Sequence, residues 1–245
     1  MEIVYEQIAP VEDLDVDASG VYVAVKDGRI VRLAPKTWLP TTLADDGYVG
    51  WYGDISVDET HVYYRHDCRY LARVPKKGGA SETIAAAEGC LGGFTLHEDD
   101  VYFYDFDDGS VARVAKSGGP VTTLVEGAQA RAGGESGPAN GIAVGDGQVY
   151  WVSDELGRIA KVATTGGPMS VVAEGLDGVD DVIVGDGFVY WSEDDRVARA
   201  PLGGGPVADI TAELTSIAPM ALALDDARLY FTDYMVGGSV WSICR

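Results

Sequence analysis

Carboxylate side chains occupy equivalent positions of a repeated sequence at Asp13, Asp54 and Asp181, each nine residues before a recurring tyrosine. Four further oxygen-bearing side chains lie within two residues of the equivalent position in their own repeat: Glu12, Asp15, Asn140 and Asp180. Ca²⁺ takes about six to eight oxygen ligands from carboxylates, amides and water. The set therefore predicts a site for a hard cation such as Ca²⁺. The competing interpretation is that each aspartate caps its own turn, as aspartate often does.

A possible catalytic group lies in the segment Tyr64, Arg65 and His66. Histidine in a loop can act as a general base near neutral pH, and an arginine can hold a carboxylate group of a substrate. The competing interpretation is that His66 is a solvated turn residue. The segment therefore carries a second hypothesis, which is catalysis by His66 with Arg65 and Tyr64.

A third hypothesis is a binding surface built from aromatic and acidic loop residues. The aromatic and amide members are Tyr48, Trp51, Tyr52, Phe106, Tyr234 and Asn140. Acids such as Asp107, Asp194 and Asp195 stand in the same set of loops. Aromatic anchors among acids suit a protein, peptide or carbohydrate ligand, and a basic partner best. The alternative is that these aromatic side chains fill space beneath the loops.

The elements that must position these residues are repeats of about forty residues. The phrases VYWVSD at 149–154, VYWSED at 189–194 and LYFTD at 229–233 mark the repeat. Its tyrosine is found at Tyr22, Tyr63, Tyr102, Tyr150, Tyr190 and Tyr230. The one long interval contains the glycine-rich segment 128–140. Six units of this period are typical of a repeat architecture.

Each unit contains four short apolar, β-branched or aromatic runs separated by Gly, Asp and Pro. Such runs at this spacing predict strands joined by tight turns, and segments such as GDG and GGP supply the residues that those turns need. The sequence therefore predicts an all-β fold, a six-bladed β-propeller with four strands per blade.

The ends of the chain suggest how the last blade is completed. The sixth unit stops after its third strand, while an extra apolar run, EIVYEQIA at 2–9, precedes the first unit. We expect this N-terminal strand to close the last blade, because that pairs an otherwise exposed edge. The repeat uses the whole chain, so we expect one domain over 1–245 and a monomer.

Alternation along the first strand of each unit predicts which side chains are buried. The residues eight before each tyrosine are all apolar, and we expect them to pack between blades: Leu14, Ile55, Phe94, Ile142, Val182 and Leu222. The other set, which includes Asp13 and Asp15, is then expected to face a central channel at whose mouth the cation site would lie.

Two of the three cysteines are predicted to form a disulfide. Cys68 lies between the second and third strands of its unit, and Cys90 lies in the segment that leaves the same unit. Both connections belong to one end of the predicted blade, so the two thiols can come within bonding distance. A Cys68–Cys90 disulfide would imply an oxidising compartment, and we expect an extracellular or periplasmic protein.

The net charge of −21 limits the classes of partner. Nucleic acid is excluded as a partner because binding it needs a basic surface, whereas cations and basic partners are favoured. The same net charge is explained equally well if its role is to keep the protein soluble. No apolar run is long enough to span a membrane. The lysines expected in turns at the opposite end of the blades, such as Lys76 and Lys116, are interpreted as solvated turn residues.

The repeated phrase resembles the YWTD repeat of low-density-lipoprotein-receptor-type propellers. It occurs as YFYD at 102–105, YWVSD with one inserted residue at 150–154, YWSE at 190–193 and YFTD at 230–233. The GGP turns resemble those of bacterial short-repeat propellers. The resemblance implies that the aromatic pair packs between blades and that the acid ties down its loop.

The acid and amide residues at the predicted channel mouth also resemble, by type alone, those of gluconolactonase-type propellers, which open lactones with a divalent cation. His66, Arg65 and Tyr64 resemble the residue types of propeller lyases that act on uronic-acid sugars. These resemblances keep open a metal-assisted hydrolase or a polysaccharide lyase as the alternative to a binding protein.

Overall fold

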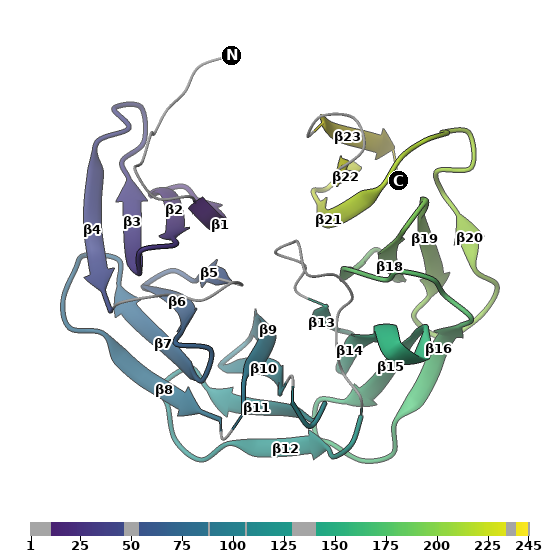
Figure 1. Cartoon of the computed structure of the whole chain (residues 1–245), viewed down its shortest axis with the longest axis horizontal. Helices are drawn as coiled ribbons and strands as arrows, with labels where there is room; N and C mark the ends of the chain where they lie inside the picture. Colours follow the sequence, from purple (N-terminus) through teal and green to yellow (C-terminus); the bar gives the residue numbers. More distant parts are fainter. Residues whose placement is uncertain are drawn as a thin grey trace. The chain divides into compact units, whose positions relative to one another are not determined.

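The computed structural model describes residues 11–46, 54–87, 89–105, 107–128, 141–233 and 239–244. Within these ranges 23 strands form six antiparallel sheets, and the helical content is one 3₁₀ turn, η1 (Asp154–Leu156). In each sheet the strands lie side by side in chain order (Figure 1). Six sheets of three or four strands confirm the predicted class, a six-bladed β-propeller.

The chain divides into two compact units. The first comprises Met1–Leu91, Glu98–Val101 and Val114–Val121, and the second comprises Gly92–His97, Tyr102–Arg113 and Thr122–Arg245. The prediction of a single domain over 1–245 stays a prediction.

Two complete sheets belong to the first unit. The first sheet contains β1 (Val11–Asp17), β2 (Gly20–Val25), β3 (Arg29–Leu33) and β4 (Pro40–Asp45). The second sheet contains β5 (Ile55–Val57), β6 (His61–His66), β7 (Tyr70–Pro75) and β8 (Glu82–Ala86).

The third sheet contains β9 (Leu91–His97), β10 (Asp100–Asp105), β11 (Val111–Ala115) and β12 (Thr122–Val125). Three sheets then follow in the second unit. The fourth contains β13 (Ile142–Gly145), β14 (Gln148–Ser153), β15 (Arg158–Ala163) and β16 (Ser170–Glu174). The fifth contains β17 (Val182–Gly185), β18 (Phe188–Glu193), β19 (Arg196–Pro201) and β20 (Ala208–Asp209). The sixth contains β21 (Pro219–Leu224), β22 (Arg228–Asp233) and β23 (Ser239–Cys244).

The turns between strands form as the glycine and aspartate pattern predicts. Asp146 and Gly147 both have positive φ, 51° and 69°, where β13 turns into β14. Two consecutive residues of positive φ make a type I′ hairpin turn, whose twist matches that of the flanking strands. The Asp-Gly pair therefore fixes the register of this hairpin.

The core lies between the faces of neighbouring sheets within each unit. In the second unit, Tyr150 and Val152 of β14 pack in one buried cluster with Trp191 of β18. In the first unit, Tyr22 of β2 packs in one cluster with Tyr64 of β6. The resemblance to YWTD repeats implied that the aromatic pair packs in this way, and the buried clusters agree with it.

The burial predicted for the first strand of each sheet is correct in five sheets and wrong in the first sheet. The side chains of Ile55, Phe94, Ile142, Val182 and Leu222 are buried. In β1, however, Leu14 and Val16 are 55% and 59% exposed, because no described sheet of the first unit covers their face. Their neighbours Asp13 and Asp15 instead face β5.

The closure of the sixth sheet cannot be followed to the N-terminus, because the predicted closing strand at 2–9 lies outside the described residues. The sheet consists of three described strands in the order β21-β22-β23. No helix in the described part of the chain is long and apolar enough to cross a membrane.

Candidate functional site

Two aspartates of β1 link the first sheet to the second. Asp13 accepts a hydrogen bond from its neighbour Leu14 N at 2.7 Å and a second from Ile55 N of β5 at 3.0 Å. Asp15 repeats this arrangement two residues further on, accepting from Val57 N of β5 at 2.8 Å. Each carboxylate therefore satisfies two backbone donors, one on its own strand and one on the next sheet.

Asp181 plays the same part in the second unit. It accepts hydrogen bonds from Val182 N and from Leu222 N of β21, both at 2.8 Å. Asp181 is 5% exposed, so these amides replace the water that a carboxylate otherwise needs. Asp13, Asp15 and Asp181 are named the bridging aspartates below.

Burial changes the acidity of these carboxyl groups. Desolvation, followed by the charge of Asp54, raises the pKa of Asp13 to about 8, although its backbone hydrogen bonds act in the opposite direction. Desolvation likewise raises the pKa of Asp181 to about 7, against hydrogen bonds from Leu222 and Val182. Burial also raises the pKa of Asp15 and of Asp54. Asp13 and Asp181 are therefore poised to change charge near neutral pH.

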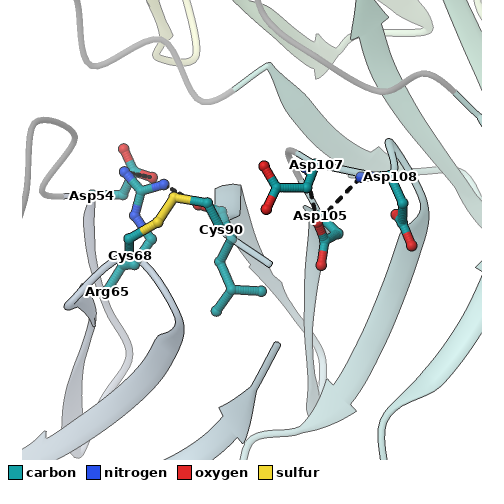
Figure 2. The surroundings of a disulfide bond; sticks show 8 residues. Asp54, Arg65, Cys68, Cys90, Asp105, Asp107 and Asp108 are labelled. Atoms are coloured by element: carbon teal, nitrogen blue, oxygen red, sulfur yellow. Dashed lines mark hydrogen bonds and ion pairs between the residues drawn. A yellow bond between two sulfur atoms is a disulfide. The ribbon is translucent and has the colours of Figure 1, made fainter. Parts of the chain in front are cut away.

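Asp54 is engaged differently, in a buried ion pair. Its carboxylate lies 3.4 Å from Arg65 Nη2, and both residues are less than 5% exposed. Arg65 Nη1 also donates to the carbonyl of Leu91. Figure 2 shows this pair beside the disulfide between Cys68 and Cys90.

The disulfide confirms the predicted pairing of Cys68 with Cys90. Leu91 N donates to Cys68 O at 2.7 Å, so a backbone hydrogen bond lies next to the covalent bond. Because Leu91 O accepts from Arg65, the disulfide and the ion pair hold the same stretch of chain. The third cysteine, Cys244, is free and exposed.

The predicted cation ligands have separate partners in the described structure. Asp13, Asp15 and Asp181 bind backbone amides, and Asp54 pairs with Arg65. The Asp180 backbone nitrogen donates to Ser192 O at 3.4 Å. The side chain of Glu12, and Asn140 as a whole, lie outside the described residues. Among the residues that are described, no group of three or more His, Cys, Asp or Glu side chains has the geometry for a metal ion.

The candidate catalytic residues lie next to one another on β6 but do not share a face. Tyr64 is fully buried and donates its hydroxyl hydrogen bond to Asp46; burial, then this bond, raises its pKa. His66 stacks on Tyr70, with ring centroids 5.1 Å apart. Arg65 points to the opposite face, as alternate residues of a strand do, and is held by Asp54.

The aromatic and amide residues of the predicted binding surface lie outside the described residues: Tyr48, Trp51, Tyr52, Phe106, Tyr234 and Asn140. The acids of the neighbouring loops are described. In the β10–β11 loop, Asp105 accepts hydrogen bonds from Asp107 N at 2.9 Å and from Asp108 N at 3.4 Å (Figure 2). The acid of this YFYD phrase thus ties down its loop, as the resemblance implied.

Exposed acids gather at one end of the sheets in the second unit. The loops that join second to third strands, and the segment that leads into β17, lie at this end. We name the following residues the acidic loop surface: Asp107, Asp108, Glu155, Asp177, Asp194 and Asp195, all exposed. Asp194 N donates to Asp177 O at 3.4 Å, so two of these segments are in contact.

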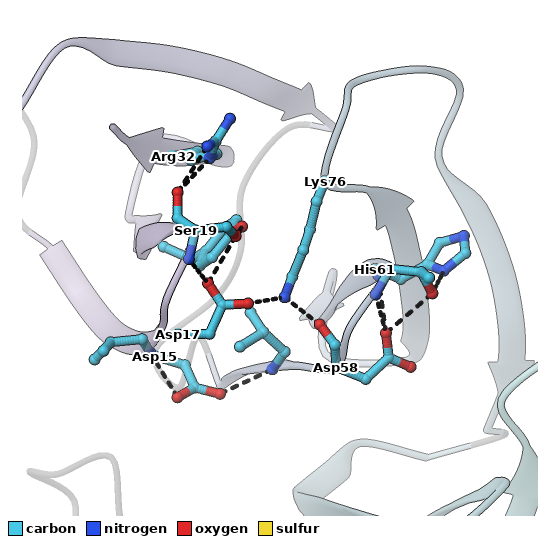
Figure 3. A network of polar contacts seen from close by, with 11 residues as sticks. Asp15, Asp17, Ser19, Arg32, Asp58, His61 and Lys76 are labelled. Carbon is cyan, nitrogen blue, oxygen red and sulfur yellow. Dashed lines mark hydrogen bonds and ion pairs between the residues drawn. The ribbon is translucent and has the colours of Figure 1, made fainter. Parts of the chain in front are cut away.

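Sequence reasoning did not find the role of the lysines, which it treated as solvated turn residues. Lys76 is only 7% exposed, and its ammonium donates to the Asp17 carboxylate and to Asp58 O, as Figure 3 shows. In the second unit Lys161 Nζ donates to Leu202 O at 2.6 Å. These lysines link consecutive sheets. The partners on the neighbouring sheets, Asp17 and Leu202, are 59 and 41 residues distant from their lysines, so only the packing of the sheets reveals them.

The six sheets and the links between them define the chain as a six-bladed β-propeller. The chain is similar to one in the crystal structure of a nidogen/laminin complex, with a TM-score of 0.61 and 15% identity. That match covers 84% of this chain and 82% of the other, and at this identity it shows the fold.

A family model described as strictosidine synthase-like, N-terminal, matches residues 8–33, which include β1, β2 and β3. Together with the structural match it supports a six-bladed, YWTD-like propeller. No curated protein matches the chain.

Proposed function

We propose that the protein is a non-covalent binding module that recognises a basic protein or peptide through its acidic loop surface. The observation that carries the proposal is the gathering of exposed acids at one end of three successive sheets. An excess of one charge on a surface attracts partners of the opposite charge and speeds their association.

The distribution of the basic residues adds to this proposal. Several cations are held by partners within the chain: Arg65 by Asp54, Lys76 by Asp17, and Arg196 by Glu193. A cation held in this way is not free to neutralise the exposed acids. The similar chain belongs to a nidogen/laminin complex, which is consistent with a role in protein binding.

The experiment is a binding titration with three synthetic peptides of equal length, one rich in lysine and arginine, one neutral and one acidic. The proposal expects binding of the basic peptide alone, weakened as salt is added, because the Debye length falls to about 10 Å at 0.1 M ionic strength. Equal binding of the basic and neutral peptides would contradict it. A carbohydrate ligand and a monomeric state stay predictions.

We further propose that the protein works in an oxidising compartment, outside the cell or in a periplasm. The Cys68–Cys90 disulfide supports this, because disulfides are rare in reducing compartments. Mass spectrometry of the protein purified from its source under alkylating conditions tests the proposal. Free, alkylated Cys68 and Cys90 would contradict it.

Calcium binding also remains a proposal, with Asp13 and Asp54 as its first candidates, because the charge of Asp54 raises the pKa of Asp13 and a bound cation would relieve this repulsion. Thermal unfolding of chelator-treated protein with and without added Ca²⁺ provides the test. A rise in the midpoint that is lost in Asp54→Asn would support an ion bound by the native state. An unchanged midpoint would contradict the proposal.

A further inference from the structure

The fifth sheet contains a buried carboxylate surrounded by nitrogen donors. Glu193, at the end of β18, accepts a hydrogen bond from Trp191 Nε1 at 2.9 Å. It also accepts from Arg196 Nε at 2.8 Å and from Arg196 Nη2 at 2.9 Å. Glu193 is only 4% exposed, so the indole and the guanidinium supply the hydrogen bonds that water would otherwise make.

The fourth sheet has the same framework with serine in the place of this glutamate. In the β18–β19 pair, Glu193 stands opposite Arg196. In the β14–β15 pair, Ser153 stands opposite Arg158, with Trp151 two residues earlier. Relative to the fifth repeat, the extra residues of the fourth repeat therefore come after Ser153, in the turn that contains η1. Ser153 occupies the position of the buried acid.

The hydrogen-bond donors of the fourth sheet are buried although no acid occupies this position. Trp151 and Ser153 are both 0% exposed. In the part of the chain that the structure describes, Trp151 Nε1, Ser153 Oγ and Arg158 Nε are shielded from solvent and have no hydrogen-bond partner. A buried donor without an acceptor is destabilising, and native proteins nearly always provide an acceptor. Two neutral donors and one cationic donor together favour an acceptor that carries negative charge.

We propose that the fourth sheet binds a small planar oxyanion of the carboxylate type between Trp151, Ser153 and Arg158. The argument for this class is one of size. The Oγ atom of serine stands where glutamate has Cγ, so the group that Ser153 lacks relative to Glu193 is the carboxylate itself. Formate has the size and shape of that group, and bicarbonate and nitrate share its planar arrangement of oxygens.

The site lies at the end of the sheet, next to an exposed turn. Arg158 is half-buried, and the neighbouring Glu155 and Leu156 are exposed, so the donors lie just beneath the surface at the turn. The guanidinium supplies the compensating charge, while the indole N–H and the hydroxyl supply directional hydrogen bonds.

The test is a titration with sodium formate, bicarbonate and nitrate, each compared with sodium chloride at the same ionic strength. Thermal unfolding and the NMR resonance of the Trp151 indole N–H, assigned with Trp151→Phe, are followed. We expect at least one planar anion to raise the midpoint and to shift this resonance with saturation. If none does so beyond chloride, the proposal is overturned.

The matched variant is Ser153→Glu, which builds the arrangement of the fifth sheet into the fourth. We expect it to raise the midpoint without added anion and to abolish the response to formate. An undiminished response in Ser153→Glu would overturn the proposal. If this variant does not fold, Arg158→Gln replaces it. Its expected effect is a loss of formate affinity of about tenfold to a hundredfold, as for a lost charged hydrogen bond, and unchanged affinity would overturn the proposal.

A second control is Asp154→Asn, which removes the carboxylate next to Ser153 in the sequence. We expect this variant to bind formate as the wild type does. If instead the wild type ignores all three anions while Asp154→Asn moves the Trp151 resonance and gains a response to formate, the acceptor belongs to the chain and the proposal of an added ion is wrong.

Discussion

At the scale of single residues, the bridging aspartates show how one side chain can serve two sheets. Asp13 and Asp181 each accept one amide from their own strand and one from the first strand of the next sheet. The two hydrogen bonds favour the charged carboxylate, whereas burial disfavours it, and burial has the larger effect. The stability of the protein should therefore depend on their protonation.

The first prediction is a fall in stability as the pH rises through neutrality. The pKa of Asp13 is about 8 in the folded protein and has the ordinary value of 3.8 when unfolded. Between these values the folded state keeps a proton that the unfolded state has released, so the free energy of unfolding decreases with rising pH. Asp181 adds to this decrease up to a pH of about 7.

Urea unfolding at a series of pH values measures this dependence. We expect Asp13→Asn to flatten the curve of unfolding free energy between about pH 4 and about pH 8, because an amide does not titrate. The control is Asp45→Asn, which removes an exposed carboxylate, and Asp13→Asn should flatten the curve more than this control does. Parallel curves for wild type and Asp13→Asn would show that the bridging carboxyl does not carry the effect.

The positions of these aspartates were visible in the sequence, but their partners were not. The equal spacing to the repeat tyrosine marked Asp13, Asp54 and Asp181 as equivalent. Asp13 and Asp181 bridge two sheets in the same way, whereas Asp54 pairs with Arg65. The bridging hydrogen bonds to Ile55 and Leu222 depend on how one sheet is offset against the next. Spacing within a repeat carries no information about that offset.

At the scale of elements, covalent and ionic links hold the connections of the second sheet. The disulfide joins residues that are 22 apart in the sequence. Its effect on a loop of this size is a stabilisation of about 3 kcal/mol, largely by restricting the unfolded chain.

The second prediction concerns this disulfide. We expect the double variant Cys68→Ser, Cys90→Ser to lose about 3 kcal/mol of unfolding free energy, measured by denaturant titration. Cys244→Ser is the control, since this thiol is free and exposed, and a change within about 0.5 kcal/mol is expected. Similar losses in both variants would mean that the disulfide contributes nothing beyond the substitution itself.

The third prediction concerns the lysine that links the first two sheets. Lys76→Met keeps the aliphatic stem but removes the ammonium that binds Asp17 and Asp58 O. We expect a loss of about 1.5–3 kcal/mol, the usual contribution of a hydrogen bond to a charged group. The adjacent Lys77 is exposed, so Lys77→Met should stay within about 0.5 kcal/mol of wild type. If the two variants lose equal stability, the link is not structural.

Element boundaries could be predicted because each turn carries its own signal, as at Asp146 and Gly147. The lysines were misjudged for a related reason. A lysine next to a turn is usually solvated, and nothing near Lys76 in the sequence indicates that Asp17, in the preceding unit, will receive its ammonium.

At the scale of the whole molecule, the sequence predicted the six-sheet fold because the repeat encodes it six times. The exposure of Leu14 and Val16 was not foreseen. These residues lie in the first sheet, and no described sheet of the same compact unit precedes it in the sequence to cover them. The function is less determined by the fold, because propellers support many functions. The function that we propose rests on the acidic loop surface.

The most direct test of that function compares two triple variants for binding a lysine- and arginine-rich peptide. One variant, Asp177→Asn, Asp194→Asn, Asp195→Asn, neutralises part of the acidic loop surface. The other, Asp146→Asn, Asp186→Asn, Asp226→Asn, neutralises exposed acids at the opposite ends of the sheets. Each removes three negative charges and so changes the net charge from −21 to −18.

We predict that the first variant weakens the affinity for the peptide about tenfold, the combined effect of three exposed charge pairs, and that the second changes it less than about twofold. Because the two proteins carry the same net charge, this difference can arise only from where the charges lie. Equal affinities in the two variants would contradict the account, since the acidity would then act through net charge alone.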